Sequence, residues 1–204
     1  MQIHLWRRVA LAVVLSLAGG LAAQAAGKPA AKASTWKSHC QPERSFCFKY
    51  PAGWTMLGEV FNGAGVMVAP PQKQERDSWD SVTVALVVPP PLGDDQPVTI
   101  DQAIRRAVEG VRQSGQSFET EQRQHRTVNG HPAQMVRLRY VEQATGHAWT
   151  EKLVFIEGPD SAIYSIALKC ATDSLPRMGP QFARIVDSWN VPQAPKPPPS
   201  QPNP

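Results

Sequence analysis

The sequence predicts an α+β fold in which helices cover the faces of an antiparallel β-sheet. Segments with strand-like alternation lie on both sides of one amphipathic segment, residues 99–115. Tight-turn signals at Asn129-Gly130 and Thr145-Gly146 separate the later strands, so neighbouring strands should run antiparallel. A second stretch with helical spacing, residues 182–189, follows the last strand. Runs of strands bounded by such helices are typical of an α+β sandwich.

The first 25 residues have the pattern of a secretory signal peptide. Arg7 and Arg8 precede a short apolar run, which ends in the small-x-small pattern of Ala23-Gln24-Ala25. A membrane-spanning helix needs about 20 apolar residues, and this run is shorter and contains Gly19-Gly20. We expect export with cleavage near Ala25; an uncleaved anchor and a cytosolic protein are the alternatives. No cysteine stands at this exit, so we expect no lipid anchor there.

Composition divides the rest of the chain into a leader, one domain and a tail. Residues 26–35 are predicted to be a flexible leader, and residues 36–191 suffice for one domain with a real core. Seven of the 20 prolines fall in residues 192–204, which predicts a disordered, polyproline-like tail. Removing the signal peptide leaves 19 basic against 17 acidic residues, a net charge of +2. Because no Lys/Arg-rich run is present, we expect no nucleic-acid partner.

The first structured segment is a predicted hairpin that contains two of the three cysteines. Cys40 and Cys47 flank a turn-like stretch, residues 42–45, and would face each other across the two strands. In an oxidising compartment this favours a Cys40–Cys47 disulfide. Pairing of either cysteine with Cys170, or three free thiols, are the alternatives. Under the favoured pairing Cys170 is a buried apolar residue on a strand.

The elements before the first helix are short strands. Phe46, Phe48 and Tyr50 share one face of the strand that Pro51 ends. Residues 66–69 form a short strand, residues 72–77 a polar loop, and residues 81–88 a continuous β-branched run, which predicts a central strand buried on both faces.

The most secure helix begins at Thr99. Thr99 and Gln102 have the form of a capping box, and Gly115 closes the segment. The stripe that should lie against the sheet consists of Ile100, Ala103, Ile104, Ala107, Val108 and Val111.

The second half of the domain is predicted to be a meander and a closing helix. Residues 118–127 are polar on both faces, which indicates an exposed or edge strand. Strands 133–143, 149–156 and 162–170 follow, the first with Val136, Leu138 and Tyr140 inward and with Arg137 and Arg139 outward. A helical region then begins at Asp173-Ser174, with Phe182, Ile185, Val186 and Trp189 on its buried side.

No pattern in the sequence brings a nucleophile, a base and an orienting group together. It contains no Gly-x-Ser-x-Gly elbow, no Walker loop and no His-Glu-x-x-His, so we expect no enzyme, no cofactor and no metal site. His125 and His131 flank the Asn129-Gly130 turn and are expected to face solvent.

Two features indicate a possible docking surface. Four arginines fall around one hairpin, either as a solvated face or as a surface for an acidic partner or lipid headgroups: Arg123, Arg126, Arg137 and Arg139. Trp79 follows the polar loop and is a candidate exposed contact, whereas Trp54, Trp149 and Trp189 are predicted core residues.

Three motifs resemble PsbP-like and DcrB-like domains. They are Phe46 to Trp54, with aromatic residues before Tyr-Pro-x-x-Trp; Val128 to Ala133, around the Asn-Gly turn; and Arg184 to Trp189 in the closing helix. The order of elements agrees over residues 36–191. The resemblance implies an antiparallel sheet between helices and a non-enzymatic binding or assembly role, as in photosystem extrinsic subunits, envelope proteins and chaperones of secreted effectors. The cysteines of the first hairpin and the proline tail are not part of that pattern.

These observations lead to two expectations for function. The first is an exported, periplasmic, non-catalytic domain that binds an envelope or exported protein or assists its assembly. The second is a carrier of a small apolar or lipidic ligand, held between sheet and helix, where such pockets form. An enzyme is the remaining alternative.

Overall fold

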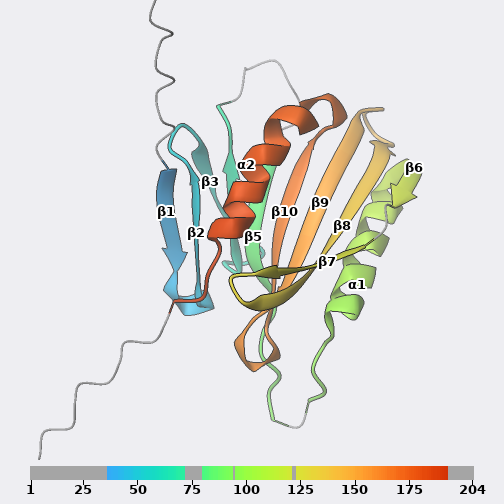
Figure 1. Cartoon of the computed structure of the whole chain (residues 1–204). Coiled ribbons are helices and arrows are strands. Elements are labelled where there is room, and N and C mark those ends of the chain that lie inside the picture. The colour runs from blue at the N-terminus through green and yellow to red at the C-terminus, as the bar shows by residue number, and fades with distance from the viewer. Residues whose placement is uncertain (1–35, 72–79, 94, 121–122, 193–204) are drawn as a thin grey trace, which may run out of the picture. The chain divides into compact units, whose positions relative to one another are not determined.

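The computed structural model describes residues 36–71, 80–93, 95–120 and 123–192 (Figure 1). The predicted signal peptide and leader, all but the first residue of the predicted tail, and Trp79 lie outside these residues. Within them, β1 (Trp36–Gln41) and β2 (Phe46–Pro51) form a hairpin around the turn η1 (Pro42–Arg44). The other strands form one antiparallel sheet in the order β3 (Thr55–Val60), β4 (Gly65–Ala69), β5 (Ser81–Val88), β10 (Ile163–Ala171), β9 (Ala148–Glu157), β8 (His131–Glu142) and β6 (Gly115–Thr120). This confirms the predicted fold class.

The sheet joins segments that are far apart in the sequence. The β-branched strand β5 pairs with β4 on one side and with β10 on the other. The predicted meander β8–β9–β10 is present, and Asn129 and Gly130 both have positive φ at the turn before β8, as a two-residue hairpin requires. The segment predicted as one edge strand forms two, β6 and β7 (Gln124–Val128), which both pair with β8. Strand β3 was not predicted, because Gly58 and Glu59 interrupt its alternation.

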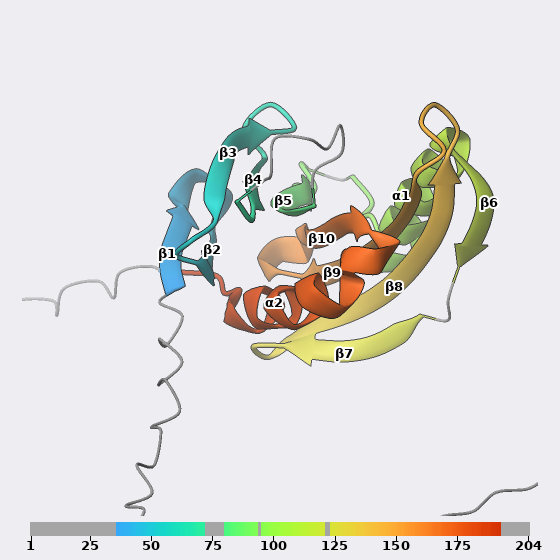
Figure 2. The ribbon, with the colours of Figure 1, turned by 90° about the horizontal axis from the view of Figure 1, so that it is seen from above.

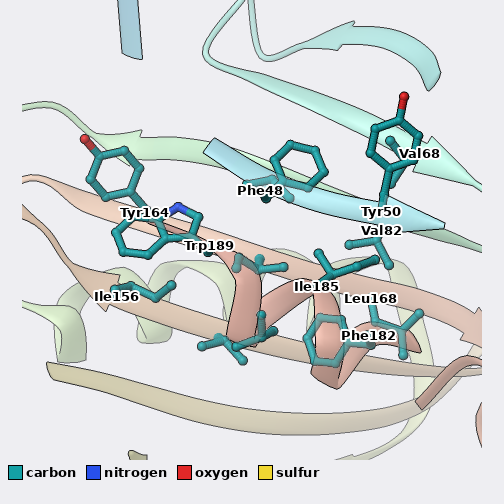
Figure 3. Packing of buried hydrophobic residues seen from close by; sticks show 14 of the residues in the cluster. Phe48, Tyr50, Val68, Val82, Ile156, Tyr164, Leu168, Phe182, Ile185 and Trp189 are labelled. Carbon is teal, nitrogen blue, oxygen red and sulfur yellow. The ribbon is translucent and has the colours of Figure 1, made fainter. Parts of the chain in front are cut away.

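One face of the sheet is closed by α2 (Leu175–Ser188) and by the β1–β2 hairpin (Figure 3). Phe182, Ile185 and Trp189 pack with Phe48 and Tyr164 in the cluster on this face. Backbone hydrogen bonds between Cys47 and Asn190 join β2 to the end of the helix. Each of the three predicted core tryptophans is buried: Trp54, Trp149 and Trp189.

The opposite face carries α1 (Ile100–Ser114), as Figure 2 shows. The predicted capping box is present: Gln102 N–H donates to the Thr99 hydroxyl, and Thr99 N–H donates to the Gln102 side chain. Ile104 is fully buried against Val136, Leu138 and Phe155. The predicted stripe therefore lies against the sheet.

Helix α1 packs over β6, β8 and β9, and leaves the same face of β4, β5 and β10 open. The prediction that β5 is buried on both faces is therefore only partly right. One face of β5 is buried, and the other is partly open. Val82 and Val84 lie in the closed core, whereas Val87 is 39% exposed on the side of α1. The single helix on this face is too narrow to cover the whole sheet, and a groove remains beside it.

Candidate functional site

The groove between α1 and the sheet is the best candidate site in the described part of the chain. It has a volume of about 520 Å³ and is open to solvent along one side. Its walls come from α1, from β4, β5, β9 and β10, and from the turn after β3. The apolar part of the lining consists of Phe61, Met67, Val87, Val88, Ala103, Ala107, Val111, Leu153, Phe155 and Ala167. This volume and lining are typical of a small-molecule site.

Short side chains create the space. Ala103 and Ala107 line the groove from the sheet-facing side of α1, together with the larger Val111, and Ser165 and Ala167 of β10 form part of its floor. Larger side chains at these positions would fill the space as the core clusters do elsewhere. The alanines in the predicted helical stripe were the only sequence signal for the groove, and small residues on a buried stripe normally indicate close packing instead.

One end of the groove is polar and its charged groups are internally paired. The Tyr140 hydroxyl donates to Glu151 at 2.7 Å, and burial raises the pKa of the Glu151 carboxyl despite this bond and the nearby Lys169. The Lys169 ammonium lies 4.6 Å from the Trp149 ring centroid and 3.8 Å from Glu142. Burial and Glu151 likewise raise the pKa of Tyr140. Glu151 and Lys169 are thus held by interactions with neighbouring side chains, and neither is an activated nucleophile.

The other end of the groove is apolar and adjoins a second hollow. Phe61 is 66% exposed at the end where Val87 lies, and its φ of 53° places its backbone in a left-handed turn. The adjoining hollow shares Val87, Val88 and Arg106 with the groove and is also lined by the triproline segment and Leu92. Leu92 is 81% exposed. Arg106 therefore stands where the two hollows meet.

A more polar hollow of about 540 Å³ lies beside the first turn of α1. Its lining includes Thr99, Asp101, His125 and Glu157. Nothing in the described residues organises these side chains around a common point. His131, at the predicted solvent-facing turn, instead contacts the Glu157 carbonyl at 3.0 Å and the edge of Trp189.

The structure does not bring the four predicted docking arginines together. Arg123 pairs with Asp101 of α1 at 2.5 Å, and Arg126 pairs with Asp187 of α2 at 2.8 Å, so these two contact helices on opposite faces. Arg137 and Arg139 lie on the face of β8 opposite Val136 and Leu138, as predicted, but they are half-buried and not fully exposed. Lys152 lies opposite Arg137 on β9, and Arg139 and burial lower the pKa of Arg137.

The cysteines adopt the pairing that the hairpin spacing favours. Cys40 and Cys47 form a disulfide between directly opposed positions of β1 and β2, with a Cα–Cα distance of 4.1 Å. Cys170 is free and fully buried. Burial, with a contribution from Asp80, raises the pKa of its thiol to about 12, so it is not a thiolate nucleophile at neutral pH.

Two further properties concern the described residues alone. They contain no group of three or more His, Cys, Asp or Glu side chains placed to hold a metal ion. None of their helices is both long and apolar enough to cross a membrane.

The fold and groove define an α+β domain with a ligand-sized apolar groove between a helix and an antiparallel sheet. The chain belongs to the Lpp-LpqN family, described as "Probable lipoprotein LpqN", which it matches over residues 38–189. No curated protein matches the sequence.

Two solved structures share the fold at 14% sequence identity. One is LpqN of Mycobacterium tuberculosis, whose title describes it as involved in cell envelope biogenesis; the similarity has a TM-score of 0.54 and covers 82% of this chain and 88% of that one. The other is the cyanobacterial PsbP of Synechocystis sp. PCC 6803, with a TM-score of 0.53 over 80% of this chain and 96% of that one. The resemblance to PsbP-like domains is therefore confirmed at the level of the fold.

Proposed function

We propose that this protein is an exported, non-catalytic binding domain of the cell envelope, and that the groove beside α1 is its ligand site. Membership in a family of probable lipoproteins supports an envelope-associated protein. The predicted signal peptide supports export. We propose that the protein is periplasmic after cleavage, because residues 1–25 have the pattern of a secretory signal peptide.

The observation that carries the proposal is the open apolar groove itself. A buried face of a sheet is normally filled by side chains, but here one half of the α1 face is left uncovered while the other half is fully packed. A small apolar or lipidic molecule would cover the exposed side chains of Phe61 and Val87 and the half-buried Met67 in the groove. Each square ångström of apolar surface removed from water contributes about 25 cal/mol.

The groove supports binding rather than catalysis. Its acidic group, Glu151, accepts a hydrogen bond from Tyr140, and its lysine is held over Trp149 beside Glu142. Ser81 lies directly opposite Lys169 in the β5–β10 register and lines the groove, but it is buried, and the groove lining contains no cysteine or histidine.

Binding to an envelope protein is the second candidate function. The exposed apolar residues Phe61 and Leu92 border the groove and its adjoining hollow, and an apolar segment of a partner could cover them. The predicted docking arginines and Trp79 belong to this second proposal.

Native mass spectrometry of the protein isolated from its own envelope tests the first candidate. We expect a retained small molecule, which Ala107→Trp should abolish by filling the groove. Arg105→Trp, on the exposed side of the same helix, is the matched control and should retain it. Mass spectrometry after crosslinking in intact cells tests the second candidate. A reproducible protein partner together with an empty groove would replace the first proposal with the second.

A further inference from the structure

The groove has three charged residues in its lining, and their surroundings differ. Glu151 and Lys169 lie at the polar end and interact with Tyr140, Trp149 and Glu142. Arg106 lies at the other end, on α1, and its side chain forms no ion pair with another described residue. Among the described residues, a bound ligand would therefore meet two charges that have partners, Glu151 and Lys169, and one, Arg106, that forms no ion pair.

The position of Arg106 follows from the helix. It lies between Ala103 and Ala107, the small residues that open the groove, and it is exposed. Position 110, one helical turn later, is glycine, and Glu109 pairs with Arg112 instead. Asp95 lines the adjoining hollow but forms no ion pair with Arg106 in the described part of the chain.

The groove beside Arg106 has a mainly apolar lining, whereas the lining of the adjoining hollow also includes Asp95 and Gln96. Val87 and Val88 line both hollows beside it, Leu153 and Phe155 continue the groove, and Leu92 borders the adjoining hollow. An apolar chain in the groove would thus end beside one guanidinium group. Guanidinium binds carboxylate and phosphate oxygens through paired hydrogen bonds.

We infer that the ligand of the groove is a single-chain amphiphile with an anionic head, which Arg106 binds while the chain lies between α1 and the sheet. This inference rests on the groove being the ligand site proposed above. Arg106 selects for the head, and the apolar walls accept the chain. A carboxylate and a phosphate monoester head share this chemistry.

Isothermal titration calorimetry with three decyl compounds, below their aggregation concentrations, tests the inference. We expect decanoate and decyl phosphate to bind more tightly than 1-decanol, and the tighter of the two identifies the source of the anion. Arg106→Gln should weaken binding of the anionic probes about tenfold and leave 1-decanol unchanged. Arg106→Lys, which keeps the charge, should restore part of the affinity.

Arg105→Gln is the matched control, because Arg105 is exposed on the same helix outside the groove lining. Thermal unfolding of each variant verifies that the fold is retained. Equal binding of the anionic probes and 1-decanol, unaffected by Arg106→Gln, would overturn the inference and leave the ligand site in place. Failure of all three probes to bind, with Ala107→Trp indistinguishable from the parent, would overturn both.

Discussion

The two faces of the sheet differ in how completely other elements cover them. On the α2 face, the helix and the β1–β2 hairpin together close a cluster of 22 buried residues, whereas the buried cluster under α1 contains seven. The α2 face uses large side chains such as Phe48, Phe182 and Trp189 (Figure 3). The α1 face has fewer large buried side chains, and its helix presents Ala103 and Ala107 to the groove and stops short of β4 and β5.

This difference suggests that the α2 face mainly stabilises the fold, whereas the α1 face provides the binding site. Burial of apolar surface dominates the free energy of folding, so most of it should come from the α2 face. The uncovered half of the α1 face can then remain accessible without unfolding the domain. Substitutions on the two faces should therefore have unequal effects on unfolding.

The largest effect is expected at the centre of the closed face. Trp189 is fully buried and its ring lies 5.1 Å from that of Tyr164 and 5.4 Å from that of His131. Trp189→Ala should lower the free energy of unfolding by about 3–5 kcal/mol, through lost burial and the cavity left behind. Urea unfolding measures this loss of stability, which should be smaller for Trp189→Phe. A loss under about 1 kcal/mol, the size of an average substitution, would show that this face is not the main source of stability.

The hairpin that helps close the same face should contribute next. The Cys40–Cys47 bridge spans seven positions, and the chain-entropy model gives about 2–3 kcal/mol for such a loop. The double variant Cys40→Ser/Cys47→Ser should be destabilised by that amount, and reduction of the parent should reproduce the change. Non-reducing peptide mapping should show this linkage, with Cys170 alkylated only after unfolding. A bridge that includes Cys170 would contradict the assignment.

The polar end of the groove should make stability depend on pH. Burial raises the pKa of Glu151 above its ordinary value, so the folded protein keeps this proton to higher pH than the unfolded chain, in which glutamate titrates near about 4.3. The contribution of Glu151 to stability should therefore decrease as the pH rises from the unfolded pKa through the folded pKa. Glu151→Gln should lack this decrease, so its stability relative to the parent should improve with pH. Urea unfolding across this range measures it; parallel pH profiles for the two proteins would contradict it.

The smallest effect on stability is expected at the mouth of the groove. Phe61 is 66% exposed, so Phe61→Ala should change the free energy of unfolding by no more than about 0.5 kcal/mol. The same variant should retain less ligand in native mass spectrometry, because Phe61 lines the groove. If Phe61→Ala lost as much stability as Trp189→Ala, the proposal that the two faces contribute unequally to stability would be wrong.

Local patterns were sufficient for most of the elements. The Thr99–Gln102 capping box, the Asn129-Gly130 turn and the Cys40–Cys47 hairpin each depend on residues close together in the chain. Helical spacing also identified which side of each helix is buried, because an amphipathic stripe must face the sheet. Strand β3 lacked such a pattern and was missed.

Alternation along β8 correctly separated two sets of side chains, but it did not show that the outward set would be half-buried. Val136 and Leu138 face α1, and Arg137 and Arg139 lie partly buried on the opposite face. A period of two tells which residues share a face and not what covers that face.

The groove was decided by tertiary structure alone. It depends on β5 pairing with β10, about 80 positions away in the chain, and on how far one helix extends across the resulting sheet. The sequence supplied the small residues Ala103, Ala107 and Ala167, but the same residues would suit close packing equally well. Only the placement of α1 over β6, β8 and β9 leaves them lining open space, because a single helix about 10 Å wide cannot span a sheet whose strands are spaced about 4.8 Å apart.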